Sequence, residues 1–467
     1  MNKRIPMLWL AGIALLAGAA QAKSDNWKQA KALEIYAHAV SIRTVKGQGK
    51  VPELAAYLAE HLVDGGFDAD DVKIYPYEET AALVARYRGD GSSGRKPILF
   101  LAHMDVVGAL KEAWQFPPFE LSEKDGYFLG RGSLDNKFGV AMLTTTFLAL
   151  KRKGFVPDRD LVLAFTGDEE SGLNTASMLV TTYRDQVDAE FALNSDIFSG
   201  ELDDSGAPLL YGIQTAEKTY ASFRIVARNP GGHSAQPRLD NAIFDIAEAI
   251  RAVQEFRFPA KSTEETRSYF RAKARQMSGE LRIAMERFAD DPADQWAIDR
   301  LFVEPAYVGL TRTTCIPTML SGGHVANALP RQASVIVNCR LLPGERVEDV
   351  LRILEGLVAG ESVAVQITGN PTAAPASPLR EDVVAAVRAA VANRFGDVEI
   401  VGKMSAGATD GLEFRLAGIP TYGTSGIFMK PNEMRAHGVN ERLPTENLTG
   451  GIDHWEILIR HLAGPGE

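Results

Sequence analysis

The segment Pro97-Ile-Leu-Phe-Leu-Ala-His-Met-Asp105 is a short apolar run that ends in polar side chains. A continuous apolar run of this length is typical of a strand that is buried on both faces of a sheet. Two runs of the same kind follow, Asp160-Leu-Val-Leu-Ala-Phe-Thr166 and Phe191-Ala-Leu-Asn194, and the Ala/Leu-rich segment 138–151 favours a helix. Strands that alternate with helices predict an α/β domain with a mostly parallel central sheet.

Polar residues follow each of the three predicted strands. His103 and Asp105 end the first, Glu169 and Glu170 follow the second, and Asp196 follows the third. In open α/β sheets, ligands bind outside the carboxyl ends of the strands, so we expect these side chains to lie close together. Imidazole and carboxylate ligands without thiolate suit zinc, cobalt or manganese.

Each motif alone has a simpler explanation. His103 could equally be a buried structural residue whose imidazole forms hydrogen bonds but binds no metal. Asp135, in Gly130-Arg-Gly-Ser-Leu-Asp-Asn-Lys-Phe-Gly139, is also suited to capping the helix that follows. Taken together, and with His437 in a polar loop near the C-terminus, the motifs predict two neighbouring metal ions and one further carboxylate as general base.

The composition argues against two classes of protein. The chain has 467 residues, 24% of them charged, and a formal net charge of -10, which argues against disorder and against a non-specific nucleic-acid binder. Residues 1–22 combine Lys3 and Arg4, an apolar run and the small-x-small sequence Ala20-Gln-Ala22, as in a cleaved signal peptide. We expect secretion, or the periplasm in a Gram-negative source, with no stable membrane anchor after cleavage; an uncleaved anchor is the alternative.

The middle of the chain has a different pattern. Near Glu217 the continuous apolar runs give way to more alternating strands, in the order strand-helix-strand-strand-helix-strand. This order predicts a small two-layer α+β (ferredoxin-like) domain over 217–372, with an extra helical insertion at about 258–305. It would be inserted into a catalytic domain formed by 23–216 and 373–467.

The ordered motifs carry a resemblance to a known family. His-x-Asp, Gly-x-x-Asp-x-Lys-x-Gly, Asp-Glu-Glu, a single Asp and His-Gly-x-x-Glu lie in this order between Ile98 and Leu443. The set resembles the M20 family of di-zinc metallopeptidases and aminoacylases. The stretch from Arg312 to Gly344 is most similar to its carboxypeptidase S and N-acyl-amino-acid hydrolase branch. The resemblance implies a zinc-exopeptidase-like catalytic domain and an inserted lid or dimerisation domain.

The resemblance also implies an activity. We expect hydrolysis of amide bonds in short peptides or N-acyl amino acids, by a metal-bridging water that Glu169 activates. The alternatives are a dipeptidase of the same family and a catalytically silent binding protein on this fold. The expected cofactors are two divalent ions, zinc first and cobalt or manganese otherwise. The implied metal ligands are His103, Asp135, Glu170, Asp196 and His437, with Asp135 bridging both ions, His103 and Asp196 on one, and Glu170 and His437 on the other.

Further roles follow from the same resemblance. Asp105 would orient His103, and the Asp135–Asn136 peptide would be cis. His233 would stabilise the oxyanion in the active site of a partner subunit, so a homodimer through the lid domain is expected. Asn327 and Arg340 would contact substrate, with Arg340 holding a carboxylate. Thr409 would line the site, although helix capping by Asp410 explains its motif equally well.

The two cysteines are placed symmetrically about Asn327. In an antiparallel pair of strands, Cys315 and Cys339 would lie directly opposite each other. We expect two buried thiols, with a cross-strand disulfide as the alternative in an oxidising compartment. A Cα separation above about 7 Å would exclude the bond.

Overall fold

The computed structural model describes residues 26–358, 360 and 362–464. The predicted signal peptide at 1–22 lies outside these residues. The chain divides into two compact units: the first contains Met1–Tyr211, Arg380–Val398 and Thr421–Glu467, and the second contains Gly212–Leu379 and Glu399–Pro420. Within the described part, no helix has the length and apolar character needed to cross a membrane.

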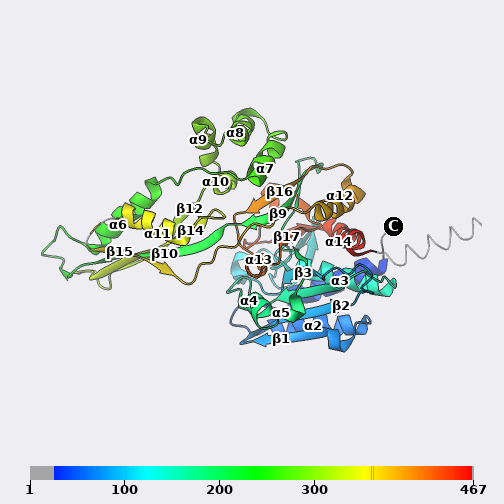
Figure 1. Cartoon of the computed structure of the whole chain (residues 1–467). Helices are drawn as coiled ribbons and strands as arrows, with labels where there is room; N and C mark the ends of the chain where they lie inside the picture. The colour runs from blue at the N-terminus through cyan, green and yellow to red at the C-terminus, as the bar shows by residue number, and fades with distance from the viewer. Residues whose placement is uncertain (1–25, 359, 361, 465–467) are drawn as a thin grey trace, which may run out of the picture. The chain divides into compact units, whose positions relative to one another are not determined.

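The first unit is built on a mostly parallel sheet (Figure 1). Its strands β1 (Val72–Tyr77), β2 (Thr80–Tyr87), β6 (Leu161–Thr166), β3 (Ile98–His103), β7 (Phe191–Asn194) and β17 (Thr421–Gly423) are neighbours in that order. β3 is parallel to both β6 and β7, and β17 is parallel to β7. Every residue of β3 and β6 is buried, which explains why their sequences are continuously apolar.

Helices cover this sheet. α2 (Val51–Asp64) contacts β1 and β2, α3 (Lys137–Arg152) contacts β3, and α14 (Asn447–Ala463) packs on α3 and on α12 (Glu381–Phe395). Residues 137–150 of α3 are all buried. The shorter elements of this unit are α4 (Asn174–Thr181), α5 (Arg184–Val187), β4 (Ser122–Lys124), β5 (Tyr127–Leu129), β8 (Gly200–Leu202), β18 (Phe428–Met429) and β19 (Arg442–Pro444).

The second unit contains an antiparallel four-stranded sheet in the order β12-β14-β10-β15. Its strands are β10 (Thr219–Arg228), β12 (Thr314–Gly322), β14 (Gln332–Leu341) and β15 (Val363–Thr368). α6 (Ala242–Glu255) and α11 (Val347–Leu357) pack on one face, where alternate residues such as Phe223 and Val337 form the core. This is the predicted α+β lid module. In β10 the face under the helices is buried throughout, whereas on the other face Tyr220, Arg224 and Arg228 are exposed.

The helical insertion follows α6 in the chain. It consists of α7 (Glu264–Ala274), α8 (Gly279–Asp290), α9 (Gln295–Phe302) and α10 (Pro305–Thr311). Its charged sequence reflects amphipathic helices, in which side chains such as Phe270 and Phe288 are buried. The second unit also contains β11 (Gly232–His233), β13 (Ala328–Leu329), β16 (Ile400–Ser405) and α13 (Gly411–Leu416), and β9 (Pro208–Glu217) leads into it.

The expectation of two free thiols at Cys315 and Cys339 is wrong, because they form a disulfide. The two residues are a directly opposed pair in the antiparallel β12–β14 ladder, with a Cα separation of 4.0 Å. That separation is below the limit of about 7 Å above which a disulfide would be excluded.

Candidate metal centre

The strand order of the central sheet brings the predicted ligands together. β3 lies between β6 and β7, so its last residue, His103, has the residues that follow both neighbours beside it. Glu169 and Glu170 follow β6, and Asp196 follows β7. Asp135 precedes α3, whose N-cap is Asn136, so Asp135 does not cap that helix. The Asp135–Asn136 peptide is cis, as expected.

Three groups of side chains have the geometry to hold a metal ion. Within each group, one ligand atom per residue lies within 4.8 Å of the others. The groups are His103 with Asp135 and Asp196, His103 with Glu169 and Glu170, and Asp135 with Glu170 and His437. The first and third are the two ligand sets that the sequence predicts, and both contain Asp135.

Asp135 lies between the two imidazoles. Its Oδ1 is 2.9 Å from Nε2 of His103, and its Oδ2 is 3.1 Å from Nε2 of His437. Nε2 of His437 is also 2.9 Å from Oε1 of Glu170, and Nε2 of His103 is 3.6 Å from Oδ1 of Asp196. Each oxygen of one carboxylate therefore faces a different ligand set, which is what a bridging aspartate requires.

The donor atoms fit divalent cations. Oxygen and imidazole nitrogen are ligands that zinc, cobalt and manganese accept. Among the residues that the structure describes, no lysine or arginine pairs with the side chains of Asp135, Glu170 or Asp196. Closely spaced carboxylates repel one another unless a cation lies between them. The side chain of His103 is 1% exposed and that of His437 is 54% exposed, so the His437 side faces solvent.

The charges of the cluster act strongly on one another. Burial raises the pKa of Asp196 to about 6, and the nearby Asp135 adds to the shift while His103 opposes it. Hydrogen bonds with Asp135 and Glu170 raise the pKa of His437 to about 10. Burial alone would lower the pKa of His103, but Asp196 and the hydrogen bonds of neighbouring acids raise it well above its usual value. Positive charge is thus strongly favoured at this position.

Asp105 lies against the imidazole of His103, through both its backbone oxygen and its carboxylate. The atom closest to Nδ1 of His103 is the backbone oxygen of Asp105, at 3.0 Å, whereas its Oδ1 is 3.5 Å away. The carboxylate also accepts hydrogen bonds from the backbone N–H of Glu169 and of Glu170, each at 3.1 Å. Asp105 therefore holds both the imidazole and the loop that carries the predicted base.

The three consecutive acidic residues after β6 have different roles. The carboxylate of Asp168 accepts hydrogen bonds from the backbone N–H of Asn174 and of Thr175, both at 2.8 Å, at the start of α4. Asp168 thus fixes the loop, while Glu169 and Glu170 reach the metal cluster. The sequence alone does not separate these roles, because all three residues are acidic and adjacent.

Glu441 is a buried part of the site to which the sequence assigned no role. Its side chain is 0% exposed and accepts hydrogen bonds from the backbone N–H of Leu134 at 2.7 Å and of Asp135 at 3.1 Å. It also pairs with Arg131 at 2.5 Å. The only signal in the sequence is its place in the motif His437-Gly-Val-Asn-Glu441.

Comparison with known proteins agrees with this geometry. Residues 99–461 match the model of peptidase family M20/M25/M40. The chain belongs to this family. Among curated relatives, the probable carboxypeptidase S-like 2 of Dictyostelium discoideum is 26% identical over 81% of this chain and 74% of its own. The human N-fatty-acyl-amino acid synthase/hydrolase PM20D1 is 28% identical over 75% of this chain and 71% of its own.

Solved structures share the M20 fold. The metallo-carboxypeptidase Sso-CP2 of Sulfolobus solfataricus has a TM-score of 0.70 at 18% identity and covers 92% of this chain and 98% of its own. The dipeptidase Dug1p of Saccharomyces cerevisiae has a TM-score of 0.70 at 18% identity, with 95% and 98% coverage. The chain is therefore an M20-type hydrolase of the peptidase, aminoacylase and dipeptidase group.

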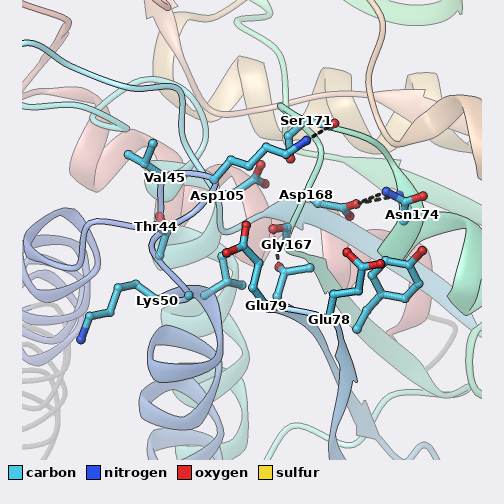
Figure 2. A pocket seen from close by; sticks show the side chains of 15 residues that line it. Thr44, Val45, Lys50, Glu78, Glu79, Asp105, Gly167, Asp168, Ser171 and Asn174 are labelled. Carbon is cyan, nitrogen blue, oxygen red and sulfur yellow. Dashed lines mark hydrogen bonds between the residues drawn. The ribbon is translucent and has the colours of Figure 1, made fainter. Parts of the chain in front are cut away.

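A small hollow lies beside the loop that follows β6 (Figure 2). Asp105, Asp168 and Ser171 line it, together with Glu78 and Glu79 from the turn between β1 and β2. None of the predicted metal ligands contributes to its wall among the described residues. The hollow is therefore separate from the metal centre of this M20 enzyme, and Asp105 stands between the two.

The other predicted M20 site residues belong to the second unit. Exposed His233 and Asn327 are neighbours, because β11 pairs with β13 and the N–H of Ser234 donates to the backbone oxygen of Asn327 at 3.0 Å. The guanidinium of Arg340 lies over the ring of Tyr220, its cross-strand partner, at 4.7 Å. Their roles toward substrate remain predictions.

Thr409 is held by a buried ion pair. Its hydroxyl donates to Oε1 of Glu217 at 2.6 Å, and the same oxygen lies 2.6 Å from the guanidinium of Arg415. The hydroxyl also accepts from the N–H of Gly411 at 3.1 Å, at the start of α13. Thr409, rather than Asp410, therefore provides the side-chain contact at that helix start.

Proposed function

We propose that this M20 enzyme hydrolyses the amide bond of N-acyl amino acids or of the C-terminal residue of short peptides. The observation that carries the proposal is the placement of the Asp135 carboxylate between His103 and His437, with Glu169 in an adjoining ligand group. The names of the Dictyostelium and human relatives, a carboxypeptidase S-like protein and an N-fatty-acyl-amino acid hydrolase, support this substrate class.

The proposed cofactors are two divalent ions, most simply zinc, with cobalt or manganese as the other candidates. His103, Asp135 and Asp196 would hold one ion, and Asp135, Glu170 and His437 the other. Ions bound there would polarise the scissile carbonyl and lower the pKa of water. Mixed imidazole and carboxylate donors are compatible with zinc.

Glu169 is the proposed general base. Its carboxylate takes one proton from water while the water oxygen adds to the carbonyl carbon of the amide. The C–N bond then breaks, and the same proton passes to the leaving nitrogen, so the products are a carboxylic acid, which keeps the second proton of the water until it ionises, and an amine. The hydrogen bond from the N–H of Glu169 to Asp105 supports this role, because it fixes the backbone of the base.

Arg340 is proposed to bind the carboxylate of the substrate. It is half-buried, and burial lowers the pKa of its guanidinium. Within the described part of the chain, the guanidinium of Arg340 forms no ion pair with an acidic side chain. A half-buried cation without an acidic partner favours an anionic ligand, and a guanidinium binds a carboxylate through two parallel hydrogen bonds.

His233 is proposed to stabilise the oxyanion in a partner subunit, with Asn327 beside it and Thr409 lining the site. The proposed dimer uses β12, which is an edge strand with exposed apolar side chains at Ile316, Met319 and Leu320. Long apolar edge strands are usually covered in native proteins, which supports a second copy as the cover. The apolar side chains of Ile243 and Phe244 in α6 are exposed as well.

Export through the N-terminal signal sequence is also part of the proposal. Disulfides form and persist in oxidising compartments and are rare in the cytosol. The cross-strand pair Cys315–Cys339 therefore supports secretion or, in a Gram-negative source, the periplasm.

The decisive experiment is hydrolysis of a panel of N-acyl amino acids, dipeptides and longer peptides by zinc-, cobalt- and manganese-loaded protein. We expect cleavage of N-acyl amino acids, and we expect it to depend on metal and on Glu169. Arg340→Ala should raise KM for these substrates, whereas Arg346→Ala should not. Preferential cleavage of dipeptides would favour the alternative of a dipeptidase. Binding without any turnover would favour a silent binding protein.

A further inference from the structure

Arg312 is a buried arginine with two nitrogen atoms that lack a partner. It lies between α10 and β12 and is 3% exposed. Its Nη1 donates to the backbone oxygen of Phe258 at 3.3 Å. Among the described residues, its Nε and Nη2 have no hydrogen-bond partner, and no acidic side chain forms an ion pair with it. Buried donors are nearly always paired, because an unpaired one is costly, so an acceptor is expected here.

Nε and Nη2 are the two atoms with which a guanidinium binds both oxygens of a carboxylate side-on. The chain uses them in this way elsewhere. In Arg88 they donate to the two oxygens of Asp71 at 2.7 and 2.6 Å, and in Arg238 to those of Asp240 at 2.9 and 2.7 Å. Arg312 therefore offers the same pair of donors with no carboxylate of the chain bound to it.

Arg312 forms part of the wall of a hollow in the second unit, which we call the Arg312 hollow. The hollow spans about 1060 Å³, open solvent at its mouth included, which is room for a small molecule. Two further segments form the wall: residues 257–260, which follow α6, and residues between 291 and 299, in the α8–α9 turn and in α9. Apolar side chains such as Phe258 and Ile298 are among them.

The charges around the Arg312 hollow favour a single negative charge in it. The guanidinium groups of Arg257 and Arg312 lie over the same ring, that of Phe302, at 4.1 and 5.0 Å. Arg257 is paired with Asp299 at 3.1 Å. Burial lowers the pKa of Arg312, and the charge of Arg257 lowers it further, while Asp299 opposes the shift. Asp291 and Asp299 are also in the wall and would repel a ligand with two negative charges.

We propose that the Arg312 hollow binds a small monocarboxylate that carries an apolar group. The carboxylate would accept hydrogen bonds from Nε and Nη2 of Arg312, and the apolar group would pack on wall side chains such as Phe258 and Ile298. The site is formed by the second unit alone, so it does not depend on the proposed amide hydrolysis. A bound ligand would connect the three wall segments and thereby stabilise the helical insertion.

The test is a titration of the full-length, metal-loaded protein with benzoate, acetate and phosphate, followed through the NMR signal of the Ile298 methyl group. This signal is assigned by its loss in Ile298→Val, and it reports binding in the Arg312 hollow rather than at the metal ions. We expect benzoate to bind more tightly than acetate, because its ring covers apolar wall. At about pH 8 phosphate carries two negative charges and should bind at least about tenfold more weakly than benzoate.

Two variants test the hollow itself. Arg312→Lys keeps the charge but removes the two parallel donors, and should weaken benzoate binding about tenfold, the scale of one charge-assisted hydrogen bond. Ala293→Phe fills the hollow from an exposed wall position, so it should block binding without disturbing the fold. The matched control is Ala373→Phe, because Ala373 is exposed in the same unit but outside the wall. Arg340→Ala should also bind benzoate normally.

The contrary outcomes are specific. Unchanged benzoate affinity in both Arg312→Lys and Ala293→Phe would overturn the proposal, as would the absence of any shift of the Ile298 signal at millimolar benzoate. Tighter binding of phosphate than of benzoate, or equal binding of acetate and benzoate, would overturn the assigned class of ligand. Thermal unfolding of each variant shows whether it is folded, and Ala293→Phe decides the matter if Arg312→Lys is not.

Discussion

The backbone N–H of Asp135 donates a hydrogen bond to the carboxylate of Glu441 at 3.1 Å. Glu441 lies four residues after His437, and His437 and Asp135 belong to the same candidate ligand group. One buried carboxylate thus joins the loop that carries one ligand to the backbone that carries the other. Burial and the nearby Asp135 raise the pKa of Glu441 to about 7, while Arg131 opposes this shift.

Glu441→Gln should weaken metal binding without removing a metal ligand. The substitution leaves Arg131 without its charged partner and disturbs the hydrogen bonds that place Asp135. Residues that orient metal ligands typically contribute about 10- to 100-fold in affinity. Competition with a chelator of known affinity measures the loss, with Glu433→Gln as the control. Unchanged affinity in Glu441→Gln would show that the ligands do not depend on this link.

Glu169→Gln and Glu170→Gln should fail in different ways. Glu169→Gln should lower kcat by at least about 100-fold, the scale of general-base catalysis, because the amide cannot take the proton. Its metal content should stay normal. Glu170→Gln should lose metal instead, because it removes a charged ligand of the His437 group. Metal analysis together with kcat distinguishes the two, and Glu123→Gln serves as a surface control.

Reduction of the Cys315–Cys339 disulfide should destabilise the second unit. The bond closes a loop with a sequence separation of 24 residues, for which chain entropy gives about 3 kcal/mol of stabilisation. Unfolding in denaturant with and without dithiothreitol measures the difference. The double variant Cys315→Ser/Cys339→Ser should show no response to dithiothreitol, and equal stability of the oxidised and reduced unaltered protein would contradict the prediction.

His454 should make the first unit sensitive to acid. Burial, aided by the charge of Arg394, lowers the pKa of His454 from 6.5 to about 3. Between these values the unfolded chain binds a proton that the folded chain does not, so stability falls as the pH drops below about 6.5. His454→Phe should flatten the dependence of the free energy of unfolding on pH between pH 6.5 and 4. Chemical unfolding across this range tests it, and His324→Gln should retain the slope.

Several elements follow from the sequence because their local signals are strong. The apolar runs at Pro97, Asp160 and Phe191 predict β3, β6 and β7 to within a residue at most ends, since strands buried on both faces tolerate few polar side chains. The turns and alternation of the middle segment predict β10 and β15 at their observed bounds. The sequence does not predict the hairpin of β1 and β2, because Lys73 and Pro76 interrupt β1 at its exposed positions.

The sequence by itself determined that His103, Glu169, Glu170 and Asp196 gather at one sheet edge, because they follow buried parallel strands. Asp135 and His437 were added by the resemblance to a family, and Glu441 was missed. The sequence did not determine which atom of each residue does what. Only the tertiary structure decided that Asp105 holds the N–H groups of Glu169 and Glu170, that Glu441 holds Asp135, and that Cys315 bonds to Cys339. Each of these contacts joins segments far apart in the chain or depends on strand register. Local sequence patterns carry no information about such distances, whereas the packed sheet fixes them.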